Sequence, residues 1–191
     1  MAYPDLLILR HGETEWNREG RIQGEMDSPL TDRGRAQAAA QGRLMADRDL
    51  SGWAMWSSPQ RRARTTAEIA LPGHHVLIDP RLSEIAMGEW TGARRAEIAQ
   101  QHPHLFDHDT DLTWYDSAPG GEGLEALYAR TGAFLATLRG PAVLVTHGIT
   151  SRMLRCHALG LEPGAFADLP GGQGVVYAIL QGKQICLSEG A

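Results

Sequence analysis

The chain has 191 residues, of which 42% are hydrophobic and 21% charged, a length and composition typical of one globular domain. With 18 basic against 23 acidic residues its formal net charge is -5, which argues against nucleic acid and anionic membranes as partners. A small anionic ligand can still bind in a local basic pocket.

The two cysteines, Cys156 and Cys186, lie far apart and form no CxxC pair. We therefore expect buried, reduced thiols rather than a disulfide framework or a zinc site. Asp5 and Arg10 interrupt the apolar N-terminal stretch, which does not resemble a secretion signal, and no apolar run approaches membrane-spanning length. These features favour a cytoplasmic protein.

Apolar runs of strand length alternate with helical segments along the chain. The first run, residues 6–9, is apolar at every position, as expected for a strand buried on both faces. Thr31 or Asp32 is predicted to cap the first helix, and Ser58 the second, with Pro59 at its first position. This alternation predicts an α/β fold, a single-domain, three-layer α/β/α sandwich with a mostly parallel central sheet. In chain order we predict strand 6–9, helix 32–48, strand 53–58, helix 59–70, strand 75–78, helices around 92–102 and 122–138, strand 142–146, helix 148–159, and a closing pair of strands at 175–180 and 183–187.

One stretch, residues 101–123 (QHPHLFDHDTDLTWYDSAPGGEG), is irregular, and long excursions in compact α/β domains are often functional. Its histidines and aspartates have a spacing that a metal ion could use. We favour a polar surface loop instead, because the potential ligands are crowded and a proline interrupts them. These residues are His102, His104, Asp107, His108, Asp109 and Asp111.

A histidine followed by a glycine comes directly after two of the predicted strands. His11 follows the first strand, and His147 follows the strand at 142–146. Ligands of parallel α/β sheets bind beyond the carboxyl ends of the strands, so both imidazoles are placed at the mouth of a potential site. Gly12 and Gly148 allow a close approach, and the helix after Gly148 is expected to offer free N–H groups to an anion. If the strands are neighbours, the two histidines can face each other. Position alone does not separate such residues from ordinary hydrogen-bonded loop histidines.

Arginines near these histidines favour a bound anion. Arg10 interrupts an otherwise apolar strand just before His11, and Arg61, Arg62 and Arg64 lie in the first turns of a helix, where cations oppose the helix dipole. Local rules are most often broken at functional sites, and a guanidinium can grip a phosphate at two points. We expect at least one of the three helix arginines to face solvent. Spacing alone does not tell which one points inward.

The segment RLSEIAMGEW can supply an acid. Glu84 precedes an apolar pair and is expected to be partly buried, and a partly buried carboxyl can donate a proton near neutral pH. Glu89 is the rival, and an exposed carboxylate without function is the alternative for either. The chain has no GxSxG elbow, P-loop or HExxH helix, which argues against serine hydrolase, nucleotide-binding and zinc peptidase chemistry.

With these motifs the chain resembles the histidine phosphatase superfamily, the RHG-motif branch of the phosphoglycerate mutase-like fold. Five motifs carry the resemblance and stand in the family's order: LRHGETEWN, GRIQGEMDSPLTDRGRAQA, SSPQRRARTTAEIA, LSEIAMGEWTG and VTHG. They run through most of the chain, which implies a single histidine phosphatase domain over residues 1–191. Thr65 and Gly123 stand where many relatives have glutamine and serine, neither at a core catalytic position.

The resemblance implies roles for individual residues. His11 would be the nucleophile that accepts the phosphoryl group, and Arg10 and Arg62 would hold the phosphate oxygens. His147 would complete the pocket opposite His11, and Glu84 would protonate the leaving oxygen. The residues on the phosphate and substrate side would be Asn17, Gln23, Gly24 and Gly148.

The resemblance further implies a metal-independent phosphomonoesterase of the histidine acid phosphatase type, acting on a small-molecule phosphate ester through a phosphohistidine. Such a cycle needs no cofactor, because positive groups surround the phosphate and the carboxyl serves as acid and then as base. A cofactor-dependent phosphoglycerate mutase is the alternative, although those enzymes carry a longer insertion between the acid motif and the second histidine. A non-catalytic phosphoester-binding module is a further alternative, although this chain keeps every catalytic position.

The excursion is our hypothesis for a lid over residues 102–122 that selects the substrate. Two of its aromatic residues, Trp114 and Tyr115, lie between acidic ones. They either cover the leaving group or anchor the packing, and the sequence does not distinguish the two.

Overall fold

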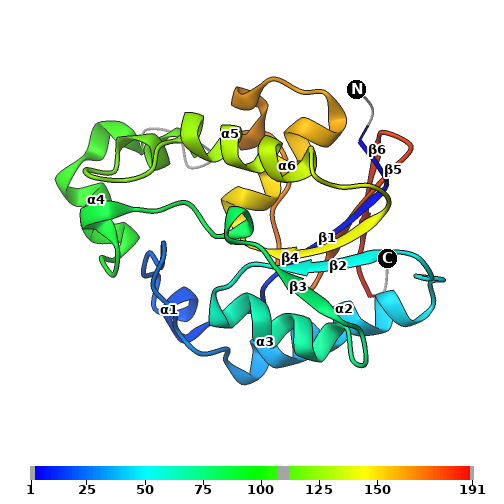
Figure 1. The fold of residues 1–191 in the computed structure, drawn as a ribbon. Helices are drawn as coiled ribbons and strands as arrows, with labels where there is room; N and C mark the ends of the chain where they lie inside the picture. The colour runs from blue at the N-terminus through cyan, green and yellow to red at the C-terminus, as the bar shows by residue number, and fades with distance from the viewer. Residues whose placement is uncertain (1–2, 107–111, 190–191) are drawn as a thin grey trace.

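A six-stranded β-sheet lies at the centre of the computed structural model, which describes residues 3–106 and 112–189 (Figure 1). Its strands are β1 (Leu6–Arg10), β2 (Ala54–Ser57), β3 (Val76–Ile78), β4 (Ala142–Thr146), β5 (Val176–Leu180) and β6 (Lys183–Leu187). They are ordered β3-β2-β4-β1-β5-β6 across the sheet. The first four are parallel, whereas β5 pairs antiparallel with β1, and β6 antiparallel with β5. The mostly parallel sheet and its closing pair of strands are as predicted.

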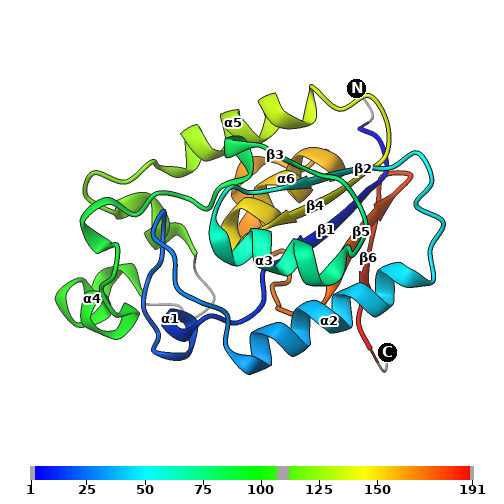
Figure 2. The ribbon, with the colours of Figure 1, turned by 60° about the horizontal axis from the view of Figure 1, so that its bottom comes forward.

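Helices cover both faces of the sheet and complete a three-layer α/β/α sandwich (Figures 1 and 2). They are α1 (Glu15–Arg18), α2 (Asp32–Ala46), α3 (Arg61–Ala70), α4 (Arg95–Gln101), α5 (Leu124–Leu135) and α6 (Gly148–Leu159). Helices α2 and α3 pack on one face of the sheet, and α5 and α6 pack on the other. The short helices α1 and α4 lie beyond the carboxyl end of β1, at the left of both views. This arrangement confirms the predicted fold class.

The central strand β1 is apolar at successive positions because both of its faces are buried. Leu7 and Leu9 belong to the core shared with α2 and α3, whereas Leu6 and Ile8 belong to the core shared with α5 and α6. Burial of each such side chain contributes about 1.5–3 kcal/mol, so the strand is anchored from two sides. The rigid strand therefore fixes the position of the backbone at His11, the residue that follows β1.

The start of α2 is as predicted, but the start of α3 is not. Thr31, rather than Asp32, is the N-cap of α2, and its side chain accepts a hydrogen bond from the helix. Helix α3 begins at Arg61, and Ser58 does not cap it. The carboxylate of Asp27 instead accepts the first amide N–H of α3 at 2.8 Å. The Ser58 hydroxyl is occupied by a histidine described below.

In its described part, the irregular stretch forms two short 3₁₀ helices, η3 (Pro103–Leu105) and η4 (Thr113–Ser117), against a third apolar cluster. Trp114 is buried in this cluster, and its ring centroid lies 6.1 Å from that of Trp90. Trp114 is therefore a packing anchor.

The structure also bears on the two cysteines and on the histidine and aspartate cluster. Cys156 is buried as expected, but Cys186 is exposed, because it lies on β6 at the edge of the sheet. Within the described ranges no three His, Cys, Asp or Glu side chains gather in a way that could hold a metal, and no helix there is long and apolar enough to cross a membrane. Four members of the histidine and aspartate cluster lie outside the described residues: Asp107, His108, Asp109 and Asp111.

A close backbone contact joins the loop after β1 to the first turn of α2. A Cβ atom added at Gly12 would lie 2.1 Å from the carbonyl oxygen of Gly34, and one added at Gly34 would lie 2.0 Å from the carbonyl oxygen of Glu13. Both obstacles are backbone atoms, which cannot move aside as the tip of a side chain can. The two glycines thus fix the path of the loop that carries His11.

We predict that Gly34→Ala destabilises the protein by about 1–3 kcal/mol, because overpacking a rigid contact outweighs the gain of up to about 1 kcal/mol that alanine brings to a helix. The free energy of unfolding is measured by chemical denaturation. Gly140→Ala is the matched control, since a Cβ there meets no atom within 4 Å. Equal stability of the Gly34→Ala variant and the wild type would contradict the contact.

Candidate active site

The ends of β1 and β4 bring the two predicted histidines together. The strands are parallel neighbours in which Arg10 is paired with Thr146, and the backbone N–H of His11 donates to the carbonyl of Thr146 at 2.9 Å. His11 and His147 therefore leave the sheet at the same level. Their ring centroids lie 5.1 Å apart. Both rings are buried, at the edge of the sheet where ligands of parallel α/β folds bind.

The hydrogen bonds of His11 determine its tautomer. Nδ1 lies 2.7 Å from the carbonyl oxygen of Gly12, and because a carbonyl can only accept, Nδ1 must carry the proton. In the neutral ring, Nε2 then has a free lone pair. The carbonyl oxygen of His11 accepts from Gln173, which lies in the segment before β5. The ring is thus held from the backbone with its basic nitrogen available.

His147 has the opposite tautomer. Its Nδ1 lies 3.2 Å from Nε of Arg62, which can only donate, so Nδ1 is the acceptor. Nε2 therefore carries the proton and donates to the Ser58 hydroxyl at 2.8 Å. The Ser58 hydroxyl also accepts the N–H of Gln60 at 3.3 Å, so its hydrogen bonds are made at the start of the loop rather than to α3. Sequence reasoning missed its part in the site, although its position directly after β2 is the same strand-end signal that marks the histidines.

Burial and positive charge both favour neutral imidazoles. The pKa of His11 lies well below the ordinary value of 6.5, first because the ring is buried and then because Arg62 and Arg10 are close. Burial followed by Arg62 and by His11 itself lowers the pKa of His147 in the same way. Neutral His11 is the form that can act as a nucleophile.

Arg62 is the helix arginine that points inward, whereas Arg61 and Arg64 are exposed. Besides His147, its guanidinium donates to the carbonyl of Met26 at 2.6 Å, to that of Gly24 at 2.8 Å and to the carboxylate of Asp27 at 3.0 Å. A guanidinium has five N–H donors, so four of them are committed to the protein. Burial lowers the pKa of Arg62, and the charges of Glu84 and Asp27 oppose that effect. Arg62 therefore offers a fixed positive charge and one remaining N–H.

The guanidinium of Arg10 is less constrained by hydrogen bonds than that of Arg62. Its Nε atom is buried and has no hydrogen-bond partner among the residues that the structure describes. The guanidinium lies against the start of α6, where a Cβ atom at Gly148 would be 3.3 Å from Cζ. Glycine at that position thus makes room for the arginine. The donors of Arg10 are the ones best able to meet a phosphate.

The start of α6 corrects one expectation. Its amides were expected to be free for an anionic ligand, but those of Ile149 and Thr150 donate to the carboxyl of Glu84, at 3.2 and 3.0 Å. Glu89, the rival acid, is exposed and does not line the pocket. The positive N-terminal end of α6 therefore binds the carboxyl group of Glu84.

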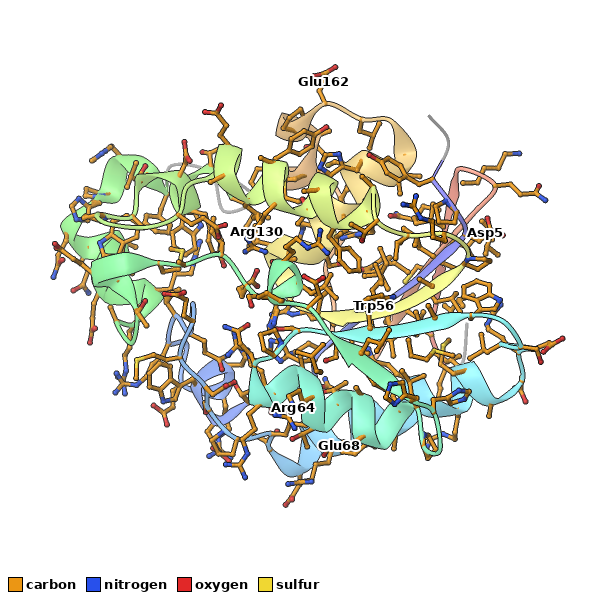
Figure 3. All side chains as sticks on the ribbon, viewed as in Figure 1. Asp5, Trp56, Arg64, Glu68, Arg130 and Glu162 are labelled. Carbon is orange, nitrogen blue, oxygen red and sulfur yellow. The ribbon has the colours of Figure 1, made fainter. Side chains whose placement is uncertain are left out.

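The backbone around Glu84 is held by α5. Arg130 extends from α5 (Figure 3). It donates to the carbonyl of Arg81 at 2.7 Å and to that of Glu84 at 3.3 Å, and its guanidinium pairs with Glu122. The amide N–H of Glu84 donates to the side chain of Gln60 at 3.0 Å. Neither Arg130 nor Gln60 was singled out from the sequence. Their contacts are made mainly to backbone atoms far away in the chain, which leave no local pattern.

The substrate-side residues line a narrow pocket of about 70 Å³. Asn17 accepts on its Oδ1 from the Thr14 N–H and from Gln173, so its amide NH₂ is available to the pocket. Gln23 is buried, and its Oε1 has no partner among the described residues. The pocket is lined by Arg10, His11, Asn17, Arg21, Ile22, Gln23, Gly24, Arg62, Glu84, Met87 and Tyr115. Two of the predicted site residues, His147 and Gly148, are not part of this lining.

Tyr115 brings the irregular stretch into this pocket. It belongs to η4 and lines the pocket, while its neighbour Trp114 is a packing anchor. Burial, followed by the charge of Glu84, raises the pKa of Tyr115 to about 12, so its phenol stays protonated at neutral pH. A larger hollow of about 650 Å³ lies near Trp53 and Leu71, at the opposite ends of the strands, and is lined by none of the predicted site residues. Chemistry, rather than size, identifies the site.

Comparison with known proteins agrees with this arrangement. The family model of the histidine phosphatase superfamily (branch 1) matches residues 6–184, so the chain belongs to that superfamily. The chain is 32% identical over 168 residues to phosphoserine phosphatase 1 of Hydrogenobacter thermophilus, an alignment that covers 84% of this chain and 79% of the relative. It is 36% identical over 167 residues to a probable phosphoglycerate mutase, GpmB, of Salmonella paratyphi C, with 84% and 77% covered.

A solved structure shows the same relationship. A mycobacterial glucosyl-3-phosphoglycerate phosphatase, in complex with VO3, superposes with a TM-score of 0.78 at 32% identity, covering 92% of each chain. The chain is therefore a phosphatase-type enzyme of the histidine phosphatase superfamily with the phosphoglycerate mutase-like fold.

We predict that Arg62→Met raises the pKa values of both histidines, because a positive charge that disfavours imidazolium is removed while the rings stay buried. Imidazole nitrogen NMR shifts followed against pH report the two titrations. Arg64→Met is the matched control, since Arg64 lies on the exposed side of the same helix (Figure 3). Titrations that stay unchanged in the Arg62→Met variant would show that this charge does not act on the rings.

Proposed function

We propose that the protein is a metal-independent phosphomonoesterase that hydrolyses a small-molecule phosphate ester through a phosphohistidine on His11. The observation that carries the proposal is the tautomer of His11, whose Nδ1–H is held by Gly12 and whose Nε2 lone pair is free. Arg10, Arg62 and Glu84 line the same pocket. We propose the histidine acid phosphatase type for this enzyme, and a cytoplasmic location for the protein.

In the first step, Nε2 of His11 attacks the phosphorus atom in line with the ester oxygen. The N–P bond forms as the P–O bond to the alcohol breaks, and Glu84 transfers its carboxyl proton to the departing oxygen. The Gly12 carbonyl stabilises the positive charge that develops on the ring, through the hydrogen bond to Nδ1–H.

Charge stabilisation in this step comes from the chain itself. Phosphoryl transfer depends mainly on positioning and on positive charge around the equatorial oxygens. Arg10 contributes free guanidinium donors, and Arg62 contributes a buried positive charge with one N–H to spare. The amide of Asn17 adds a neutral donor, and the Nε2–H of His147 points to Ser58 rather than to the phosphate. These groups do the work that a metal ion does in other phosphatases.

In the second step the phosphohistidine is hydrolysed. Glu84, now a carboxylate, takes a proton from water while the water oxygen bonds to phosphorus and the N–P bond breaks. Inorganic phosphate leaves, and His11 and Glu84 return to their starting protonation states. No cofactor enters either step.

We further propose that the segment around η4 selects the leaving group. Tyr115 supplies the wall of the pocket, and its neighbour Trp114 anchors that wall to the core. The names of the relatives point to small phosphate esters that carry a carboxylate, phosphoserine and glucosyl-3-phosphoglycerate. A phosphoglycerate mutase is the second candidate, on the strength of the likeness to GpmB.

We expect the wild type to release inorganic phosphate from phosphomonoesters in the presence of a metal chelator. The panel is O-phosphoserine, 3-phosphoglycerate, α-ribazole 5′-phosphate and p-nitrophenyl phosphate. His11→Ala should lower kcat/KM by at least about 10³-fold, since removal of a nucleophile removes the covalent route. Arg64→Met, exposed on α3, serves as the control variant and should retain activity.

Release that requires an added metal, or that survives in His11→Ala, would contradict the proposal. Each reaction with 3-phosphoglycerate is also assayed for 2-phosphoglycerate, with and without a bisphosphate primer. Primer-dependent isomerisation with little phosphate release would favour the mutase. Tight binding of the esters without turnover would indicate a binding module.

A further inference from the structure

The two oxygens of the Glu84 carboxyl group have unequal surroundings. Oε1 lies within hydrogen-bond distance of three donors: the N–H of Ile85 at 3.1 Å, the N–H of Thr150 at 3.0 Å and the hydroxyl of Thr150 at 3.0 Å. Among the residues that the structure describes, Oε2 is approached by a single donor, the N–H of Ile149, at 3.2 Å. Oε1 is therefore anchored, and Oε2 retains lone-pair capacity for a proton or a ligand.

The Thr150 hydroxyl has one proton and two acceptors within reach. It lies 2.7 Å from the carbonyl oxygen of Ser83 and 3.0 Å from Oε1 of Glu84. A backbone carbonyl can only accept, so the hydroxyl can serve one of these oxygens at a time. Thr150 is fully buried in the first turn of α6, where its backbone is fixed by the helix. A rotation of its hydroxyl is thus the simplest change available around the carboxyl.

We propose, resting on the function proposed above, that Thr150 is a positioning residue that tracks the protonation state of Glu84. When Glu84 is neutral, its proton is on Oε2, the two N–H donors satisfy Oε1, and the Thr150 hydroxyl donates to Ser83. When Glu84 is a carboxylate, the hydroxyl turns and donates a third hydrogen bond to Oε1. Thr150 thereby keeps Oε2 as the oxygen that exchanges protons with the substrate.

The proton balance follows the two steps of the reaction. As the P–O bond breaks, the proton on Oε2 moves to the alcohol oxygen, and the Thr150 hydroxyl stabilises the carboxylate that is left. As water attacks the phosphohistidine, Oε2 takes one proton from that water and the hydroxyl turns back to Ser83. The proton of Thr150 never leaves its own oxygen, so no additional donor or acceptor is needed.

The expected consequence depends on the leaving group. A hydrogen bond to a charged carboxylate that forms only as the proton leaves favours proton transfer by about 10-fold or more. An alkoxide needs that proton in order to depart, whereas p-nitrophenolate is stable without it. Loss of the hydroxyl should therefore slow cleavage of alkyl phosphates selectively. A role confined to packing would slow both classes by the same factor.

The test compares kcat/KM for p-nitrophenyl phosphate with that for the fastest alkyl ester among O-phosphoserine, 3-phosphoglycerate and glycerol 2-phosphate. This parameter reports phosphoryl transfer to His11 and is independent of later hydrolysis. Thr150→Val removes the hydroxyl and keeps the shape, and we expect a loss of about 10-fold on the alkyl ester and less than about 2-fold on p-nitrophenyl phosphate. Thr150→Ser should restore the alkyl activity.

Thr146→Val is the matched control. Thr146 is also fully buried. Its hydroxyl donates at 2.7 Å to the carbonyl of Leu82, the residue before Ser83, and not to Glu84. It should change the two kcat/KM values by a common factor. Should Thr150→Val fail to fold, Thr150→Ala against Thr150→Ser gives the same comparison.

An equal loss on both substrates, or no loss on either, would overturn the role of Thr150. Failure of the proposed function is a separate outcome, seen when His11→Ala releases phosphate as fast as the wild type.

Discussion

The parallel pairing of β1 with β4 is the constraint on which the site depends. Each strand is buried on both faces, so neither can slide by one residue without turning its apolar side chains to the wrong layer. The pairing of Arg10 with Thr146 then fixes His11 opposite His147. The hydrogen bond from the His11 backbone N–H to the Thr146 carbonyl is the last one between the two strands. The hydrophobic core thus sets the distance between the two imidazoles.

Most strong donors around the pocket are already engaged with the protein. Arg62 donates four of its N–H groups to Met26, Gly24, Asp27 and His147. The backbone N–H groups of Ile149 and Thr150, at the start of α6, donate to Glu84. Such groups cannot reorient when a ligand arrives, so their charges act without a cost of reorganisation. The freer guanidinium of Arg10 is then left to adapt to the ligand, which divides the arginines into a fixed charge and a direct contact.

The sequence predicted the layers, the strand ends and the inward placement of the two histidines, because these follow from local patterns of burial and turn residues. It could not rank Arg61, Arg62 and Arg64, because helix spacing does not tell which face meets a loop 35–38 residues earlier in the chain. Ser58 was assigned to a helix cap that Asp27 supplies instead. The start of α5 shows the same limit, since Gly123 adopts a φ of 78° and Asp116, eight residues from Leu124, accepts the Leu124 N–H.

Formation of a phosphohistidine on Nε2 of His11 is the central claim, and it can be tested directly. The enzyme is mixed with a phosphomonoester, quenched in alkali within milliseconds to seconds, digested and mapped by mass spectrometry, with NMR to identify the substituted nitrogen. We predict one phosphoryl group per chain, on His11 and on Nε2, the nitrogen that the Gly12 carbonyl leaves free. A phosphoryl group on His147, on Nδ1 of His11, or on no residue of an actively turning-over enzyme would contradict it.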